Sequence, residues 1–388
     1  MKKPVFFWLF ALLIAQCNPI TDLPSEDLII QNVRLFDGEK VVENATVLTE
    51  NGMVTDIITQ KVTSYTGQNV IKGDNRTLVP GLINAHVHAS KKEHLAEAAR
   101  DGVLTLLDLF NKSADNTSRL RSLRDSAGYA YYYSAGRTVT VPGGHGTQFG
   151  EVPTVKKASE VAGFVEDRLE EGSDYIKLIL ERGQASNPLP TLTKEMMEQA
   201  IQTAGEKGVI SVVHISRRSD AIEAAKLGVS GLAHIWSRDS AEISDLEVTL
   251  LREKNVFIIP TLYVYKKAAR EAGRSINLKL PKNDLLRLHQ AGVSILAGTD
   301  APNFGIDYGT DLISEMKLLV ESGLTEIEAL KSATSLASES FRLGERGLIR
   351  VGYSADFILI DGNPIEEIGD LTKIVGVWKQ GQSIVKVQ

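Results

Sequence analysis

Six polar side chains stand near the ends of apolar runs, where the chain otherwise has the character of buried strand. Imidazole nitrogens and carboxylate oxygens are the ligands that zinc and similar divalent ions take in proteins. A lysine is rarely buried without a partner, so its presence in such a run needs an explanation. Each residue alone could pack in the core or cap a helix, but together they predict a metal centre. The six are His86, His88, Lys177, His214, His234 and Asp300.

His86 and His88 stand two apart in the stretch "VPGLINAHVHAS". In an extended strand, residues i and i+2 lie on the same face, so both rings point one way and Val87 points the other. The two histidines can therefore bind one ion from a single strand. Pro80 and Gly81 before them mark the passage between two structural units.

The middle of the chain alternates apolar strand-like runs with helical stretches. Several of these helices end at a glycine before the next strand, as in "AGEKGVISVVHIS" and "LHQAGVSILAGTD", which is typical of a parallel α/β fold. Eight such units predict a (β/α)8 TIM barrel, whose active site forms at the carboxyl ends of the strands. A doubly wound sheet is the rival fold, but the sequence lacks the Gly-rich phosphate loop expected after its first strand. The predicted strands lie near residues 82–88, 103–110, 129–135, 173–180, 209–216, 231–236, 256–263 and 293–300.

Both chain ends differ from the middle in their sequence pattern. Short β-branched runs separated by Asp-Gly and Asn-Gly turns occupy residues 28–78, and the same pattern returns in "SADFILIDGNP". Such runs are typical of hairpins. We therefore predict a small β-sandwich domain formed by residues 28–81 and 343–388, with the TIM barrel between them at residues 82–342.

The N-terminal residues 1–17, "MKKPVFFWLFALLIAQC", have the pattern of a secretory signal peptide and are short for a membrane span. Cys17 is the only cysteine, which excludes an intrachain disulfide. "LIAQC" resembles a bacterial lipobox, although Gln16 departs from the usual small residue, and a plain signal peptide is the alternative. We expect export to the bacterial periplasm or outer surface, with a lipid on Cys17 anchoring the protein to a membrane.

Composition and charge narrow the class of partner. The chain has 43 basic and 49 acidic residues, a net charge of −6, and no basic block, so nucleic acid is not expected as a partner. A chain of 388 residues that is 43% apolar is globular in composition and can bury a large core. We expect a small-molecule substrate, and a homo-oligomer is compatible with these features.

The six polar residues follow the order H-x-H, Lys, His, His, Asp on strands one, four, five, six and eight. In this order they resemble the amidohydrolase superfamily of metal-dependent hydrolases. "TLVPGLINAHVH" is similar to its strand-one signature, and "LGERGLIRVGYSADFILIDGNP" is similar to its return into the small β domain. The likeness extends from about residue 28 to the end of the chain. "VPGGHGTQ" resembles a Gly-Gly-His loop of the imidazolonepropionase-like and Xaa-Pro dipeptidase-like branch.

The resemblance implies two divalent metal ions, with zinc expected, and a carboxylated lysine between them. Lys177 would take up carbon dioxide on its amine, and the resulting carbamate would bridge the ions. The buried cation would thereby become an anion that neutralises metal charge. One ion would be held by His86, His88 and Asp300, and the other by His214 and His234.

The resemblance also implies a mechanism. A hydroxide bridging the ions would attack the substrate, because bound metal lowers the pKa of water. Asp300 would accept its proton and pass it to the leaving group. His145, in the Gly-Gly-His loop, would help to stabilise the oxyanion, although it could also be an ordinary loop residue.

Arg217 and Tyr263 are candidates for substrate binding. A guanidinium can grip a carboxylate through two hydrogen bonds, so Arg217 suggests an acidic substrate group. Deaminases of the superfamily tend to have Glu in this place and dipeptidase-like members Tyr; the chain departs from both, and deamination is disfavoured. Alternatively, Arg217 is a surface residue beside Arg218, and Tyr263, after strand seven, is a packed aromatic.

These features favour a metal-dependent amidohydrolase that hydrolyses amide or peptide (C–N) bonds of a small substrate, such as a dipeptide or N-acyl amino acid. The alternative is a lactone, cyclic-amide or phosphotriester hydrolase, because the same binuclear site serves all of these reactions. A binding lipoprotein without catalysis is the third reading, and it is disfavoured because all six ligand positions are filled.

Overall fold

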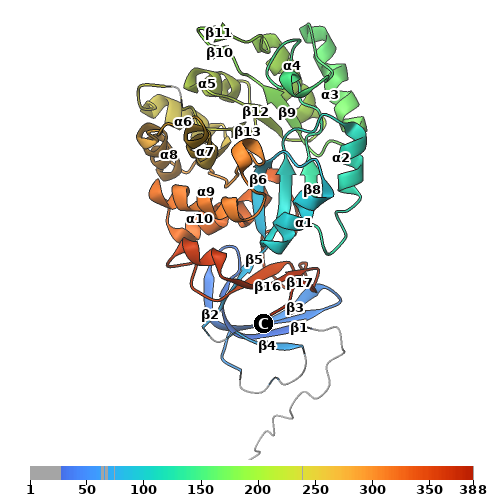
Figure 1. The fold of residues 1–388 in the computed structure, drawn as a ribbon, viewed down its shortest axis with the longest axis vertical. Helices are drawn as coiled ribbons and strands as arrows, with labels where there is room; N and C mark the ends of the chain where they lie inside the picture. The colour runs from blue at the N-terminus through green and yellow to red at the C-terminus, as the bar shows by residue number, and fades with distance from the viewer. Residues whose placement is uncertain (1–27, 63–64, 66–68, 74, 238, 388) are drawn as a thin grey trace, which may run out of the picture.

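The structure, a computed structural model, describes residues 28–62, 65, 69–73, 75–237 and 239–387. A large α/β unit lies above a small β domain in Figure 1, and both ends of the described chain belong to the small domain. The predicted signal peptide and lipobox at residues 1–17, with Cys17, lie outside the described residues. Within the described ranges, no helix is both long and apolar enough to cross a membrane.

The small domain is one connected sheet with the strand order β17-β16-β15-β5-β1-β2-β3 and with β4 beside β1. It differs from the predicted two-sheet sandwich, because the sheet curls until Met53 of β3 bridges Ser354, just ahead of β15. Side chains from both chain ends, such as Val33, Leu78 and Phe357, share its core. The strands are β1 (Leu28–Phe36), β2 (Val41–Glu50), β3 (Met53–Ile58), β4 (Val70–Lys72), β5 (Thr77–Pro80), β15 (Phe357–Ile360), β16 (Ile374–Lys379) and β17 (Gln382–Val385).

Parallel strands form the inner wall of the barrel. β6-β7-β8 make one sheet and β9-β12-β13-β14 make another, and a bridge between Val139 and Leu178 joins the two. The strands are buried on both faces, which is why they appear in the sequence as continuous apolar runs. They are β6 (Leu82–Val87), β7 (Val103–Asp108), β8 (Tyr131–Ser134), β9 (Ile176–Ile179), β12 (Ser211–His214), β13 (Gly231–Ala233) and β14 (Phe257–Ile259).

The eighth predicted strand, residues 293–300, lies within the described residues, but it forms only an isolated bridge and no continuous strand. One bridge attaches this closing segment to β14, and a second joins Ala301 to Val87 of β6. Gly298 is required here, because a Cβ would lie 2.8 Å from the backbone nitrogen of His86. The ring of parallel segments is thus completed by single bridges, where we predicted an eight-stranded ladder.

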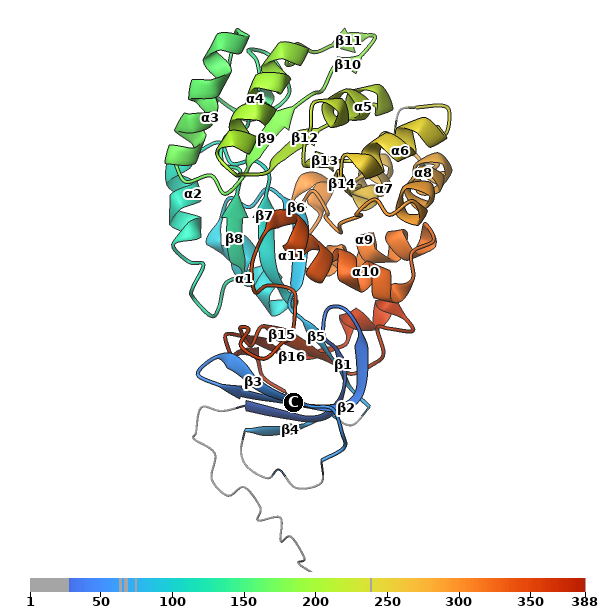
Figure 2. The same cartoon turned by 180° about the vertical axis from the view of Figure 1, so that it is seen from behind.

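Helices cover the outside of the barrel, as Figure 2 shows from behind. Before α4, Thr193 accepts a hydrogen bond from the backbone nitrogen of Met196. After α4, Gly208 has a φ of 73°, which glycine adopts without strain, and β12 follows. The helices are α1 (Lys92–Arg100), α2 (Ala114–Arg121), α3 (Val161–Glu170), α4 (Lys194–Glu206), α5 (Arg218–Lys226), α6 (Asp245–Glu253), α7 (Leu262–Glu271), α8 (Lys279–Gln290), α9 (Thr310–Glu321), α10 (Glu326–Ser332) and α11 (Ser335–Phe341), with short 3-10 turns η1 (Thr147–Phe149), η2 (Ala158–Glu160), η3 (Asn303–Gly305) and η4 (Ile368–Thr372).

A buried lysine joins the small domain to the barrel. Lys379, at the end of β16, has no exposed surface. Its Nζ donates hydrogen bonds to the backbone oxygens of Arg124, Ser126 and Tyr129, at 2.6, 2.9 and 2.8 Å. The same ammonium lies 3.9 Å from the centre of the Tyr131 ring, at the start of β8. These contacts fix the small domain against the amino ends of the barrel strands.

Candidate metal centre and active site

The carboxyl ends of the barrel segments bring the six predicted ligands together. The Nε2 atoms of His86 and His88 lie 3.2 and 2.9 Å from Oδ1 of Asp300. The ring centre of His234 lies 4.8 Å from that of His86 and 4.6 Å from that of His214. His86 lies in β6 and His88 just after it, Lys177 lies in β9, His214 ends β12, His234 follows β13, and Asp300 ends the closing segment.

The pKa shifts of four of these residues suit metal binding. At His88, burial alone would lower the pKa, but the hydrogen bond to Asp300 and the charge of that carboxylate raise it. Burial lowers the pKa of His86, His214 and His234, so their rings are neutral and can offer a nitrogen lone pair. Burial alone would raise the pKa of Asp300, but the nearby His86 and His88 hold it well below its usual range. One ligand atom from each of His86, His234 and Asp300 lies within 4.8 Å of the other two, which a single ion can span.

Lys177 provides the test of whether the site fits a metal centre. Its side chain is buried, and its Nζ has no hydrogen-bond partner among the described residues. Desolvation lowers its pKa to about 7, so much of the amine is uncharged at neutral pH. Nδ1 of His86 and Nδ1 of His88 also lack a partner within the described chain. Unpartnered buried polar atoms are rare in proteins, and this set of nitrogen and oxygen donors fits zinc or a similar ion.

Backbone strain and a hydrogen-bond relay position His234. The backbone φ is 74° at His234, 49° at Thr261 and 65° at Asp300, a left-handed conformation that is uncommon for non-glycine residues. Nδ1 of His234 lies 2.7 Å from Oγ1 of Thr261, which fixes the ring. α7 begins directly after Thr261, and its first two backbone N–H groups donate to the buried carboxylate of Glu315, at 2.9 and 2.6 Å.

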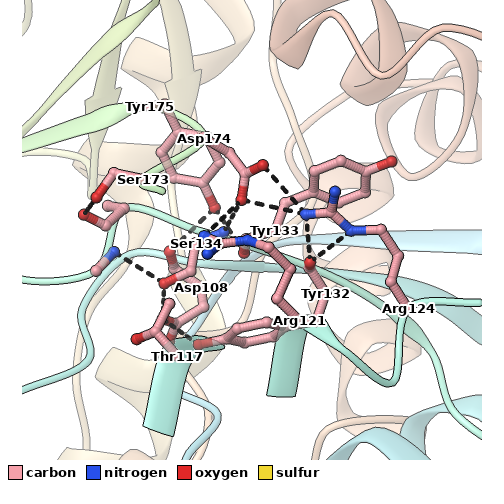
Figure 3. Close-up of polar contacts among 12 residues, drawn as sticks. Asp108, Thr117, Arg121, Arg124, Tyr132, Tyr133, Ser134, Ser173, Asp174 and Tyr175 are labelled. Carbon is pink, nitrogen blue, oxygen red and sulfur yellow. Dashed lines mark hydrogen bonds and ion pairs between the residues drawn. The ribbon is translucent and has the colours of Figure 1, made fainter. Parts of the chain in front are cut away.

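Asp108, at the end of β7, supports the first histidine pair and was not predicted. Figure 3 shows its carboxylate between Tyr132 and Ser134, whose hydroxyls donate to it at 2.8 and 2.5 Å. It also accepts a hydrogen bond from the backbone nitrogen of Ala89, at 3.1 Å, which holds the chain just after His88. Desolvation raises its pKa to about 6. An aspartate inside the apolar run "VLTLLDLF" was the available signal.

The loop that carries His145 covers the other half of the site. The ring centres of His145 and His214 are 4.7 Å apart. Burial lowers the pKa of His145 to about 4, so its ring is neutral and can donate one hydrogen bond. Glu181, which was not predicted, is buried just after β9, and its Oε2 lies 3.6 Å from Nε2 of His214. Its place at a strand end is the same signal that identified Lys177.

Two cavities open onto this centre. The larger has a volume of about 890 Å³ and the smaller about 740 Å³. Both are lined by His145, His214, Asp300 and Phe304. A substrate bound at the centre can therefore extend into either cavity.

Arg217 does not line either cavity, contrary to its predicted role. Its Nη2 donates a hydrogen bond to the backbone oxygen of Gly183, at 2.8 Å. Gly183 belongs to the short hairpin formed by β10 (Gly183–Gln184) and β11 (Asn187–Pro188). Arg217 thus holds the hairpin that forms one wall of the larger cavity.

Tyr263 also lies outside both cavities. The predicted seventh strand runs to residue 263, but β14 ends at Ile259 and α7 begins at Leu262. The change from strand to helix alters which side chains face the site, and Tyr265 lines the larger cavity instead. The ring of Tyr263 packs beside Lys267, whose Nζ lies 5.8 Å from the ring centre.

Comparison with known proteins finds relatives that align with most of this chain. The chain is similar to an ochratoxinase of Aspergillus niger, with 25% identity over 377 residues that cover 79% of this chain and 75% of the relative. It is also similar to an imidazolonepropionase of Deinococcus radiodurans, with 24% identity over 370 residues that cover 84% and 88% of the two chains. The solved structure of a Xaa-Pro dipeptidase with bound methionine in the active site shares the fold, with a TM-score of 0.79, 22% identity, and coverage of 92% of this chain and 99% of that chain.

The sequence model described as the Amidohydrolase family matches residues 77–385. The matched region begins at β5, contains the whole barrel with its ligands, and includes the strands that return into the small domain. The chain therefore belongs to the amidohydrolase family.

Proposed function

We propose that this chain is a metal-dependent amidohydrolase that cleaves the amide bond of a small N-acyl amino acid or dipeptide. The observation that carries the proposal is Lys177, a buried amine without a partner among the described residues, surrounded by four histidines and an aspartate. A catalytic metal centre accounts for such an amine, whereas a packed core does not. The Xaa-Pro dipeptidase with the same fold supports a peptide-like substrate.

The chain offers ligands for two divalent ions, with zinc expected. When bound, such ions supply Lewis acidity and lower the pKa of water towards neutrality. The uncharged amine of Lys177 would form a bond to the carbon of CO₂ and release a proton, giving an anionic carbamate between the two groups of ligands. By the resemblance to the family, one group would be His86, His88 and Asp300, and the other would be His214 and His234.

Asp300 and His145 would act on the substrate directly. Asp300 is ionised, so it can accept a proton from the attacking water and pass it to the leaving amine. His145 is neutral and faces the centre, so its N–H can stabilise negative charge that develops on the carbonyl oxygen. Glu181 would hold the ring of His214 in place during the reaction.

We assign the substrate carboxylate to Arg274 in place of Arg217. Arg274 is exposed and lines the larger cavity. Its guanidinium makes no hydrogen bond or ion pair with the other described residues, so it can form two hydrogen bonds to a carboxylate. Arg217, by contrast, already donates to Gly183.

Metal analysis and a substrate screen test this function. Protein purified under metal-replete conditions should contain up to two equivalents of zinc or a similar ion, and a complete lack of metal would overturn the site. The loaded enzyme should hydrolyse dipeptides or N-acyl amino acids. Turnover confined to lactones, cyclic amides or phosphotriesters would overturn the assignment to linear amides while leaving the metal centre intact.

We also propose that the chain is exported and anchored through a lipid on Cys17, because residues 1–17 have the pattern described for a lipoprotein signal. Expression in a bacterium fed labelled palmitate should label the wild-type protein and not Cys17→Ser. An unlabelled wild-type protein of reduced mass would indicate a plain, cleaved signal peptide instead.

A further inference from the structure

The smaller cavity has an aromatic wall beside the metal centre. Phe110, Phe149 and Phe304 line it, together with Leu109, Ile179 and Pro302, and we call this region the aromatic lobe. Phe149 is 52% exposed and Phe304 is 49% exposed, although both are large apolar side chains. Apolar surface gathered at one place on a soluble protein usually marks a binding site.

Two of the three rings lie beside histidines of the site, and all three come from separate loops. The ring centre of Phe110 lies 6.2 Å from that of His88 and 6.2 Å from that of Phe149. The ring centre of Phe149 lies 6.1 Å from that of His145. Phe304 follows Asp300 by four residues and has a φ of 54°, so its position is held at a cost in backbone strain. Independent loops thus place aromatic rings beside His88 and His145.

The larger cavity is also lined by apolar side chains, such as Leu189, Val264 and Ile276, but it contains the exposed cation of Arg274. A guanidinium can form two hydrogen bonds to a carboxylate. A substrate that extends into both cavities can therefore place an aromatic ring in the aromatic lobe and a carboxylate beside Arg274.

We propose that the aromatic lobe binds an aromatic ring of the substrate next to the scissile amide, while Arg274 in the larger cavity receives the substrate's charged end. This inference rests on the proposed function and names its substrate class. Aromatic rings attract each other in offset or edge-on arrangements at centre separations of roughly 4.5–7 Å, and the lobe leaves room for a further ring against its walls. The preferred substrates are N-aroyl amino acids or N-acyl aromatic amino acids.

Hydrolysis of matched amides provides the first test. The panel has three substrates. N-acetylalanine has no aromatic ring, N-benzoylalanine has a ring on the acyl side of the amide bond, and N-acetylphenylalanine has a ring on the amine side. One of the two ring-bearing substrates should exceed N-acetylalanine in kcat/KM by about tenfold. Phe110→Ala and Phe304→Ala should each reduce that ratio, because they remove a wall of the lobe.

Leu246→Ala is the matched control, because Leu246 is an exposed apolar residue that lines neither cavity. It should leave the ratio unchanged. Equal kcat/KM values across the panel, or ratios that Phe110→Ala and Phe304→Ala do not alter, would overturn the aromatic preference while the proposed amide hydrolysis stands.

Binding separates this inference from the proposed function. Benzamide should bind the metal-loaded protein about tenfold more tightly than acetamide by calorimetry, and the Phe110→Ala/Phe304→Ala double variant should lose the difference. Tight benzamide binding without hydrolysis of any amide would refute the proposed function and retain the lobe. Equal binding of the two amides would refute the lobe.

Discussion

At the scale of single residues, Lys177 has the most unfavourable environment in the site. A charged ammonium without partners in the barrel would be strongly destabilised, and desolvation lowers its pKa to about 7. Conversion to a carbamate that binds metal removes this penalty. The residue is therefore expected to stabilise the folded protein only when both carbon dioxide and metal are present.

Replacing Lys177 tests its role as a ligand. Lys177→Ala should reduce kcat by about 1000-fold, because the centre loses its bridging anion. Short carboxylic acids such as acetate should restore part of the rate and of the bound metal by taking the place of the carbamate. Lys226→Ala, at an exposed position on α5, is the control and should keep full activity. Full activity in Lys177→Ala would remove the bridging role.

Glu315 is a second buried charge, and it acts through the backbone. Desolvation raises its pKa to about 7 from an ordinary value of 4.5, although two N–H groups of α7 donate to it. Between these two pH values the unfolded chain has lost the proton that the folded chain still binds. The free energy of unfolding contributed by Glu315 therefore falls as the pH rises from 4.5 to about 7, and the full cost persists above pH 7.

Glu315→Gln should remove this pH dependence, because the amide is neutral and keeps an oxygen that accepts from α7. The Tm of the variant minus that of the wild type should be smallest below pH 4.5 and should rise until about pH 7. Thermal unfolding at a series of pH values measures the difference. A difference independent of pH would mean that Glu315 titrates normally in the folded protein.

The sequence could predict the residues that the fold brings together at the centre, but not the residues that orient them. His86, Lys177 and Asp300 are polar residues in apolar runs, a signal that needs no knowledge of neighbours. Asp108 and Glu181 carry the same signal, but their importance depends on contacts with His88 and His214 that only the folded chain creates. Single carboxylates in a sequence have too many structural uses to be assigned without those contacts.

At the scale of elements, the hairpin of β10 and β11 is the reason why we propose Arg274, and not Arg217, as the residue that binds the substrate carboxylate. Arg217 bonds to this hairpin, whereas Arg274, after α7, lines the larger cavity. Arg217 can therefore influence the substrate only through the position of the hairpin. Arg274 is free to contact the substrate itself.

This difference predicts distinct kinetic signatures. Arg274→Met should raise KM by about tenfold for a substrate with a free carboxylate and have little effect on the matching carboxamide. Arg217→Met should raise KM equally for both. Arg270→Met, on the same helix end but outside both cavities, is the control. An equal response of the two substrates to Arg274→Met would refute the clamp.

The barrel strands could be predicted because each is an apolar run that ends near a polar residue, but their exact ends could not. Residues 256–263 appear as one strand by composition, yet the chain turns at Thr261 and continues as α7. The turn depends on Glu315, which lies more than fifty residues away and supplies the carboxylate that α7 needs. The same limit applies to the closing segment, whose bridges depend on its neighbours on both sides.

At the scale of the whole molecule, Lys379 is the principal polar contact between the small domain and the barrel described above. Lys379→Met should lower the free energy of unfolding by about 2 kcal/mol, because it leaves three partly buried carbonyl oxygens without their donor. Thermal unfolding checks this. Lys373→Met changes an exposed lysine nearby and should leave the Tm unchanged. An unchanged Tm in Lys379→Met would show that the contact between the small domain and the barrel depends on apolar side chains alone.

The closing segment connects the closure of the barrel with the proposed metal site. The backbone nitrogen of Asp300 donates to the oxygen of His86 at 2.8 Å, and that of His88 donates to the oxygen of Ala301 at 2.7 Å. The bonds that seal the ring therefore also set the spacing of His86, His88 and Asp300, and an ion bound between these predicted ligands would help to hold the ring closed. Chelation should accelerate amide hydrogen exchange around residues 84–88 and 297–302 more than in β12 or β13. Uniform exchange after chelation would mean that the ring of strands stays closed without a bound ion.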